Sequence, residues 1–448
     1  MGLKDEIRPL LPPTSRAFLD RTDSLSEALN QQSVKTEKIE HELRQIRQNQ
    51  TSFLSVLGDL RYINLEYFIK LAQSASDILV AGWYGAENFG DELMLQTLLQ
   101  CFPEDSLDRI SVLLWDNFYY PTDLLDPRVT ILHYPKSTWD LDQLVDHFST
   151  LVWGGGAIID DDQYDSDPNN TNTGNLFIRL SKKMIARGKR VYCLGLSTND
   201  SISDRAYLRE LGPIVQNSIA FSLRDPYSKK VLESSGINGD AIQVCEDLAF
   251  ANAQLAKLPL HTVRRNDAPL RIALVPLSVP NLLGHYRTVI ELLLGVLPEI
   301  SDNYEFHLVP FLNDRGGHDA RYCAELIDGI PDEHLVVDPY QGTLEGLHFE
   351  KNDFLISYKY HAALISLIQG VNTLCVCAEN HPHYMNKMTH LVQLLSNPRH
   401  LASLSEFERD VRGTVLTLIS DQPAPKTHAQ FLENQRSLLK SLCTDIVK

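Results

Sequence analysis

From about residue 76 onward, short apolar runs alternate with segments of helical periodicity. This alternation is typical of parallel strands connected by helices. The first series of expected strands comprises Ile78–Ala81, Ile110–Leu114, Val129–Leu132, Leu151–Trp153, Arg190–Leu194 and Ile219–Leu223. The helices expected between them include Glu92–Cys101, Leu176–Arg187 and Pro226–Ser235. The pattern therefore predicts an α/β fold in which helices cover a parallel sheet.

A second series of the same kind follows a less regular segment, Ala251 to Ala268, which we interpret as a linker at 251–268. The strands expected after it are Leu270–Val275, Glu305–Val309, Leu335–Val337, Asp353–Ser357 and Thr373–Cys377. We therefore predict two doubly wound, Rossmann-like domains, one at 74–250 and one at 269–448 that includes the C-terminal helices. In such sheets, ligands bind at the carboxyl ends of the strands, so we expect a cleft there.

The N-terminal segment, 1–73, has a different pattern. Apolar and small polar residues recur in alternating steps of four and three, which is a heptad seam. Its members are Leu25, Leu29, Gln32, Thr36, Ile39, Leu43, Ile46, Gln50, Phe53, Leu57 and Leu60. The seam favours a coiled coil that makes the protein a homo-oligomer. The alternative is one amphipathic helix packed on its own subunit.

Composition limits the classes of partner. A net charge of −17 argues against a general nucleic-acid binder, which needs a basic face. No apolar run is long enough to span a membrane and no signal peptide is evident, so a cytoplasmic location is expected. The seven cysteines are scattered without metal-ligand or CxxC spacing, and we expect buried thiols rather than a metal site.

The stretch GWYGAENFGD at 82–91 directly follows the first expected strand. It does not match the GxGxxG pattern of dinucleotide-binding loops. Glycines such as Gly85 would still allow backbone amides to approach a ligand, and a helix start favours anions. Asn88 and Asp91 are candidate polar groups of this site, although Asp91 has the alternative role of helix N-cap.

A second glycine-rich stretch, Gly154, Gly155 and Gly156, follows the fourth expected strand. Three successive glycines are entropically costly, which indicates a close approach to a ligand or to a neighbouring helix. The acidic run Asp160–Asp162 comes soon afterwards. We interpret these carboxylates as solvated loop residues rather than metal ligands.

Cationic residues stand at two further junctions between a strand and a helix. Arg224 lies in the stretch SLRDPYS at 222–228, where Asp225 suits an N-cap and Pro226 suits the first helical position. Lys359 and His361 lie at the end of the expected strand Asp353–Ser357. Arg224 either contacts an anion or pairs with Asp225, and the Lys–His combination favours a functional role over a structural one.

Taken in order, these stretches resemble the polysaccharide pyruvyl transferase family. The corresponding family motifs are GxxGxxNxGD, a GGG loop, SxRD and RLHA. They align here with 82–91, 154–156, 222–225 and 359–362, while Glu246 and Asp247 resemble a short acidic segment of the family. Two positions depart from the family pattern, because Lys359 replaces an arginine and Tyr360 replaces a leucine.

The resemblance implies a two-domain fold similar to GT-B glycosyltransferases. It implies transfer of a pyruvyl group from phosphoenolpyruvate to a sugar, which gives a cyclic ketal and phosphate, with no further cofactor. His361 would be catalytic, and Arg224 and Lys359 would bind the phosphoenolpyruvate anion. By its residue type, Asp91 is a candidate partner of this histidine. The acceptor would be a sugar of a cell-surface polysaccharide or its lipid-linked precursor, which would bring the enzyme to the membrane surface.

The residue types suit this chemistry. Phosphoenolpyruvate carries about three negative charges near neutral pH and needs cationic partners even in an acidic protein. Ketal formation moves protons, and histidine suits that role. Two alternatives stay open: a nucleotide-sugar glycosyltransferase on the same architecture, and a catalytically silent scaffold that assembles a polysaccharide complex through its heptad helix.

Overall fold

The computed structural model describes residues 71–115, 125–135, 138–162, 164–165, 173–198, 202–262, 268–277, 282–313, 318–326, 330–377, 382–395, 401–420 and 428–448. The fold below belongs to the unit Gln73–Lys448. The predicted heptad seam at 25–60 lies outside the described residues, so self-association through it stays a prediction.

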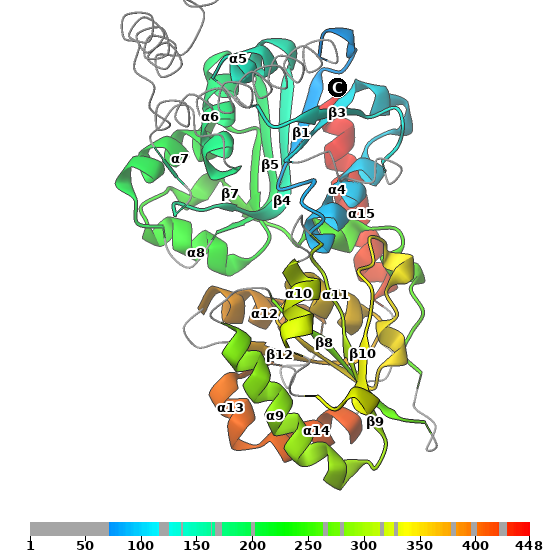
Figure 1. The fold of residues 1–448 in the computed structure, drawn as a ribbon. Coiled ribbons are helices and arrows are strands. Elements are labelled where there is room, and N and C mark those ends of the chain that lie inside the picture. Colours follow the sequence, from blue (N-terminus) through cyan, green and yellow to red (C-terminus); the bar gives the residue numbers. More distant parts are fainter. Residues whose placement is uncertain are drawn as a thin grey trace, which may run out of the picture. The chain divides into compact units, whose positions relative to one another are not determined.

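A parallel seven-stranded sheet forms the first half, in the order β3-β2-β1-β4-β5-β6-β7 (Figure 1). Its strands are β1 (Ile78–Ala81), β2 (Ile110–Leu114), β3 (Thr130–His133), β4 (Thr150–Ile159), β5 (Arg190–Thr198), β6 (Ala220–Leu223) and β7 (Ile242–Val244). All six strands predicted for this half are present, and two of them have the predicted bounds. The edge strand β7 was not predicted, because it is short and two of its three residues are exposed.

Gly154, Gly155 and Gly156, which were expected in a loop, belong instead to strand β4. This strand has 10 residues and reaches Ile159. Gly154 pairs with Leu194 and Gly156 pairs with Leu196 of β5. Glycine is a weak strand former, but the neighbouring strand β5 supplies backbone partners for this part of β4. The prediction ended the strand at Trp153 because it used only side-chain pattern.

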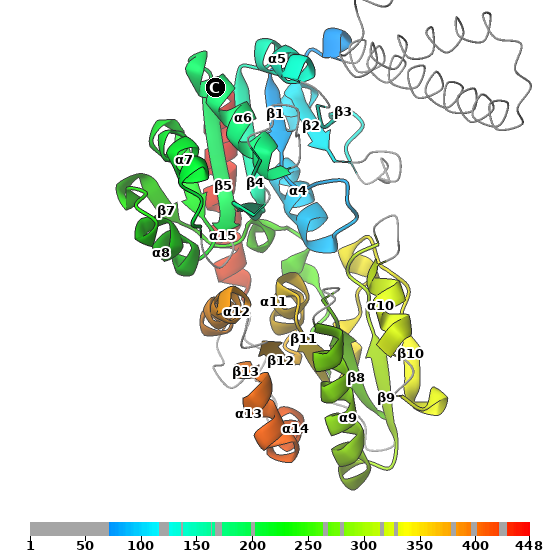
Figure 2. The same cartoon turned by 60° about the vertical axis from the view of Figure 1, so that its left-hand side comes forward.

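Helices cover both faces of the first sheet (Figure 2). They are α4 (Phe89–Cys101), α5 (Thr138–His147), α6 (Thr173–Ala186), α7 (Arg205–Asn217) and α8 (Pro226–Ser234). As predicted, Asp225 is the N-cap of α8 and Pro226 begins it, with Asp225 accepting a hydrogen bond from the Ser228 backbone amide. Helix α4 starts three residues before its predicted start at Glu92.

The second half has a parallel six-stranded sheet, ordered β10-β9-β8-β11-β12-β13. Its strands are β8 (Leu270–Val275), β9 (Tyr304–Leu308), β10 (Leu335–Val337), β11 (Phe354–Ser357), β12 (Asn372–Cys377) and β13 (Leu401–Ser403). Its helices are α9 (Leu283–Ile300), α10 (His318–Leu326), α11 (Tyr360–Ile368), α12 (Pro382–Leu395), α13 (Leu404–Arg409) and α14 (Val411–Ser420). Only the edge strand β13 was not predicted.

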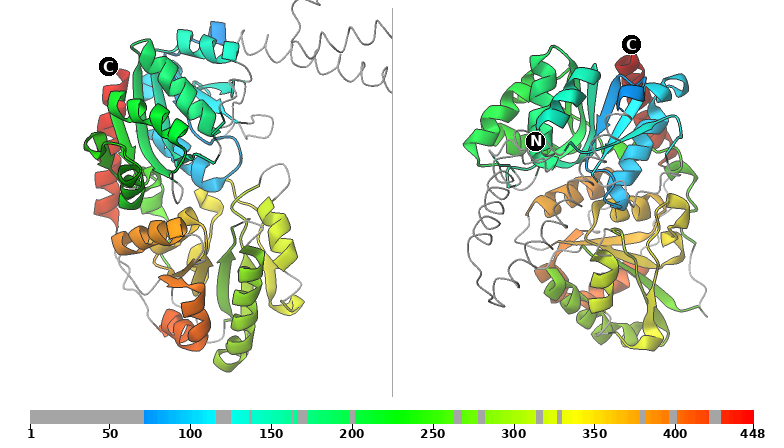
Figure 3. Two further views of the ribbon diagram at one scale, coloured as in Figure 1. Left: turned by 90° about the vertical axis from the view of Figure 1, so that its left-hand side faces the viewer. Right: turned by 45° about the horizontal axis from the view of Figure 1, so that its top comes forward.

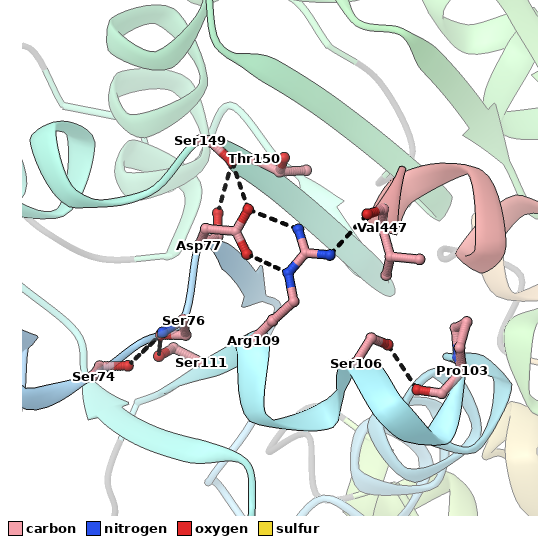
Figure 4. Close-up of polar contacts among 10 residues, drawn as sticks. All are labelled: Ser74, Ser76, Asp77, Pro103, Ser106, Arg109, Ser111, Ser149, Thr150 and Val447. Carbon is pink, nitrogen blue, oxygen red and sulfur yellow. Dashed lines mark hydrogen bonds and ion pairs between the residues drawn. The ribbon is translucent and has the colours of Figure 1, made fainter.

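The C-terminal helix α15 (Ala429–Val447) packs against the first half, beside α4 (Figure 3). The ring of Phe431 lies 5.2 Å from that of Phe250, which belongs to the short helix η5 (Leu248–Ala251). Arg109 joins the end of the helix to the start of β1, because it donates to the carbonyl of Val447 at 2.8 Å and to the carboxylate of Asp77 (Figure 4). The apolar face of α15 thus completes the core of the first half, although its sequence follows the second.

The two strand orders decide where a site can form. The connections change direction between β1 and β4 in the first sheet and between β8 and β11 in the second. Such switch points leave a crevice at the carboxyl ends of the strands. Residues 82–91 follow β1 and residues 358–361 follow β11, so Asn88, Asp91, Lys359 and His361 lie at these two points. Arg224 instead follows β6. Within the described residues, no helix combines the length and apolar character that a membrane span needs.

Candidate active site

A cavity of about 390 Å³ brings together side chains from both halves. It is lined by Trp83, Asn88, Asp91, Trp115, Gly156, Ala157, Ile158, Arg224, Tyr360 and His361. Of the site residues predicted from sequence, five contribute to this lining: Asn88, Asp91, Gly156, Arg224 and His361. Gly85, Gly154, Gly155 and Lys359 lie outside it.

The first turn of α4 forms one wall. Asn88 is the N-cap, so the alternative interpretation of Asp91 as N-cap is wrong. Asn88 forms an isolated bridge with Leu312, and the Phe89 amide donates to the carbonyl of Phe311 at 3.0 Å. These backbone contacts fix the stretch 82–91 to the second half.

Gly90 allows His361 of the second half to approach this turn. A Cβ atom at Gly90 would overlap the imidazole ring of His361, so no larger residue fits without movement. The FGD motif therefore has a steric reason: its glycine makes room for the histidine, and its aspartate follows directly.

Asp91 is buried beside several charges. Burial raises the pKa of its carboxyl to about 6, while the nearby His361, Arg224 and Lys359 oppose that rise. A carboxyl group that titrates near 6 exchanges a proton readily around neutral pH. Asp91 is therefore suited to accept or to hold a proton in the cavity.

Asp247 contacts Arg224 of the first half and His361 of the second half. Its Oδ2 accepts from Nη1 of Arg224 at 2.8 Å, and its Oδ1 lies 3.3 Å from Nε2 of His361. Burial pushes the pKa of Asp247 upward, but His361 and Arg224 outweigh burial and hold it below its ordinary value. Asp247 is therefore ionised, and it orients both side chains toward the cavity.

Arg224 is only 6 % exposed, so it is not the surface partner of Asp225 that one interpretation of the sequence allowed. Its guanidinium carbon lies 5.0 Å from the ring centroid of Tyr360, which is a cation–π contact. Among the described residues, Nε of Arg224 and the hydroxyl of Tyr360 have no hydrogen-bond partner. Buried donors without partners are costly, so the ion pair with Asp247 and the ring of Tyr360 satisfy the buried guanidinium only in part.

Lys359 lies at the same junction as His361 but faces a different carboxylate. Its Nζ is 2.6 Å from Oδ2 of Asp319 on α10, and the same oxygen accepts from the Phe311 amide at 2.8 Å. Burial lowers the pKa of Lys359 against the opposing effect of Asp319. The ammonium group is therefore engaged in a buried ion pair within the second half.

The three glycines of β4 have two different roles, packing and cavity lining, which the sequence alone could not assign. A Cβ at Gly154 would lie 2.6 Å from the Tyr84 hydroxyl, and one at Gly155 would lie 2.5 Å from Sδ of Met94 on α4. These two glycines thus allow close packing against the first half's own residues. Gly156, with φ of 91°, lies beside Oδ1 of Asp91 and lines the cavity.

Gly85 belongs to the turn rather than to the cavity lining. Its φ is 84°, a conformation that favours glycine, and its amide donates to Oε1 of Glu92 at 2.8 Å. The glycine therefore shapes the turn 82–91 so that Asn88 and Asp91 reach the cavity.

Five residues of the cavity lining were not among the predicted site residues: Trp83, Trp115, Ala157, Ile158 and Tyr360. Asp247, which contacts Arg224 and His361, was not among them either. Asp247 was noted only for its resemblance to a family segment, and Tyr360 only as a departure from the family motif. The signal for Asp247 was its position three residues after the end of β7, a strand too short to be predicted. Among the described residues, no group of three His, Cys, Asp or Glu side chains is arranged to hold a metal ion.

Sequence comparison decides the family. The profile of the polysaccharide pyruvyl transferase family matches residues 88–377. The chain belongs to this family. The match contains Asn88, Asp91, Arg224, Asp247 and His361, and it confirms the resemblance derived from the motifs. No curated protein matches the chain.

Solved structures show the same fold at low sequence identity. HepE from Anabaena, solved with UDP and glucose, is 14% identical with a TM-score of 0.50, over 83% of this chain and 96% of HepE. UDP-GlcNAc 2-epimerase from Methanocaldococcus jannaschii is 10% identical with a TM-score of 0.51, over 82% and 98%. A glycosyltransferase from Rickettsia africae is 10% identical with a TM-score of 0.50, over 84% and 99%. The pyruvyl transferase family member thus has the predicted GT-B-like architecture of two parallel-sheet α/β domains.

Proposed function

We propose that the protein transfers a pyruvyl group from phosphoenolpyruvate to a sugar, forming a cyclic ketal and releasing phosphate. Membership in the polysaccharide pyruvyl transferase family supports the reaction class. The single observation that carries the assignment to this cavity is that Asp91, Arg224 and His361 line it together. The acceptor is a sugar of a cell-surface polysaccharide or its lipid-linked precursor, and the reaction takes place in the cytoplasm.

The reaction balances without a further cofactor. One sugar hydroxyl gives up its proton to a base and forms a bond to C2 of phosphoenolpyruvate, while the methylene carbon gains a proton from an acid and becomes a methyl group; the proton lost by the base to solvent balances the one that the acid regains. A second hydroxyl of the same sugar then forms its bond to C2, and the bond from C2 to the phosphate oxygen breaks. The proton of that second hydroxyl leaves with the phosphate or with a base.

The proposed roles follow from the positions of the side chains. Arg224 binds the carboxylate or phosphate of the donor, since guanidinium groups suit such anions. His361 delivers the proton to the methylene carbon, and Asp91, whose pKa is raised to about 6, accepts a proton from a sugar hydroxyl. Asp247 does not contact the reacting atoms in this scheme; it positions Arg224 and His361. Lys359 does not line the cavity and contributes positive charge from a greater distance. Asn88 offers its side-chain amide to the substrate.

The test is incubation of the full chain with phosphoenolpyruvate and a panel of sugar acceptors, with phosphate release and product mass as readouts. We expect acceptor-dependent phosphate release and a product whose mass corresponds to one pyruvate ketal. A thermal-shift panel with UDP, GDP and phosphoenolpyruvate distinguishes this function from that of a nucleotide-sugar glycosyltransferase. Stabilisation by UDP or GDP, without stabilisation by phosphoenolpyruvate, would indicate a nucleotide-sugar glycosyltransferase.

A further inference from the structure

Two exposed tryptophans, Trp83 and Trp115, lie at the cavity and have no part in the chemistry proposed above. Trp83 is 38 % exposed and Trp115 is 48 % exposed. Among the exposed large apolar side chains of the described residues, these are the two aromatic ones, and both line the cavity. An exposed aromatic pair concentrated at one polar cavity is a feature of ligand-binding surfaces.

The backbone holds these tryptophans next to each other. Trp83 follows β1 and Trp115 follows β2, and the two strands are parallel neighbours. The amide of Trp115 donates to the carbonyl of Tyr84 at 2.7 Å, which ties the two strand ends together. Tyr84 itself is fully buried, so this connection is anchored in the core. Each tryptophan therefore stands within two residues of a strand end, and a backbone hydrogen bond connects the two segments.

The chemistry of the indole ring favours contact with the sugar acceptor over contact with phosphoenolpyruvate. The face of an aromatic ring carries partial negative charge, which attracts polarised C–H groups and disfavours an anion. A pyranose ring offers such C–H groups on one face and hydroxyl groups at its edge. Phosphoenolpyruvate is small and strongly anionic, so it fits the part of the cavity near Arg224 and His361.

Resting on the proposed function, we infer that Trp83 and Trp115 form a stacking platform for the hexopyranose ring of the acceptor. The platform would hold the ring so that its hydroxyls reach Asp91, which lines the same cavity. Tyr360, the third aromatic side chain of the cavity, lies over Arg224 and would remain on the donor side. The two tryptophans thus determine which acceptors bind, while Arg224, Asp247 and His361 serve the donor.

The test uses the full chain and the variants Trp83→Ala, Trp115→Ala and the double variant. Ile219→Ala is the control, because Ile219 is 62 % exposed and does not line the cavity. Methyl glucoside, methyl galactoside, methyl mannoside and their disaccharides are titrated by calorimetry, without donor, and uridine is titrated in parallel. We expect saturable binding of at least one pyranoside, weakened roughly 5- to 100-fold by each alanine substitution, by analogy with base–aromatic stacking. Trp83→Phe and Trp115→Phe should restore part of the affinity.

The kinetic arm measures phosphate release from phosphoenolpyruvate. We expect the tryptophan variants to raise the acceptor KM while the donor KM and kcat stay near the values of the Ile219→Ala control. Unchanged pyranoside affinity in the double variant, no pyranoside binding to the wild type, or binding of uridine alone would each overturn the platform. A third outcome separates the two proposals. If the wild type binds a pyranoside that the double variant does not bind, yet releases no phosphate with any acceptor, the proposed reaction fails and the sugar platform stands.

Discussion

Nε2 of His361 lies 3.3 Å from Oδ1 of Asp247, so a histidine of the second half contacts a carboxylate of the first half across 114 positions of sequence. The other carboxylate oxygen of Asp247 binds Arg224. One buried aspartate therefore sets the positions of both Arg224 and His361. A second histidine, His390, makes a similar contact with the adjacent Glu246 at 3.1 Å, so the segment after β7 joins the halves twice.

The substitution Asp247→Asn should destabilise the protein and abolish most of its activity. It would leave Arg224 buried without a countercharge, which costs roughly 3–5 kcal/mol of unfolding free energy. Denaturant unfolding measures this loss. Removing both charges with Arg224→Met and Asp247→Leu should recover most of the stability but none of the activity. Equal stability of Asp247→Asn and the wild type would show that the ion pair is unimportant.

His361→Ala should lower kcat by roughly 10²–10⁴-fold, because it removes a general acid while leaving Arg224 in place. Binding of phosphoenolpyruvate, measured by calorimetry, should remain within a few-fold of the wild type, and circular dichroism checks the fold. A near-normal kcat with every acceptor would mean that the histidine is structural. Full loss of activity with an unchanged oligomer would argue against the scaffold alternative.

Lys359 should affect stability and donor binding separately. Lys359→Met removes the ammonium group that pairs with the buried carboxylate of Asp319, and loss of one member of a buried ion pair should cost roughly 3–5 kcal/mol of unfolding free energy. Lys359→Arg keeps the charge and restores the residue that the family motif has, so we expect a donor KM equal to or below that of the wild type. If Lys359→Met remains folded with an unchanged donor KM, the lysine serves only the ion pair with Asp319.

Titration of Asp91 should make kcat/KM depend on pH near pH 6. Burial raises the pKa of its carboxyl to about 6, so the ionised form needed to accept a proton is lost as pH falls through that value. We expect kcat/KM to rise with pH through about 6 in the wild type, and this limb to be absent from the weakly active Asp91→Asn.

Titration of the Asp91 carboxyl should also lower the stability of the folded protein as pH rises. Because the folded state keeps the proton of Asp91 between its ordinary pKa of 3.8 and about 6, the wild type should lose stability relative to Asp91→Asn as pH rises through this window. Thermal unfolding of both proteins across pH 3.5–7 measures the difference, with Asp240→Asn on an exposed turn as the control. A pH-independent difference would contradict the raised pKa.

The N-terminal segment should drive self-association. The reason is the heptad seam from Leu25 to Leu60, which lies between polar residues. Light scattering should give a smaller assembly for a chain that starts at Ser74 than for the full chain. An unchanged assembly size would mean that the segment packs on its own subunit.

The sequence by itself determined the fold class and the family. Apolar runs such as Ile78–Ala81 and Leu270–Val275 coincide with strands because buried parallel strands require continuous apolar side chains. The edge strands β7 and β13 escaped prediction, since short strands with polar or half-buried residues carry no such signal. The ordered motifs also placed Asp91, Arg224 and His361 at strand ends, where they line the observed cavity.

Only the tertiary structure decided which charges meet. Local sequence left open whether Arg224 pairs with Asp225 or contacts an anion. In the structure Asp225 caps α8, and the guanidinium pairs with Asp247, 23 positions farther along the chain. Lys359 and His361 are two residues apart, yet one faces Asp319 and the other Asp247. A pairing of this kind depends on how strands β6, β7 and β11 are placed by their sheets, and on burial that makes each unpaired charge costly. That information resides in the packing of distant segments and in no single stretch of the chain.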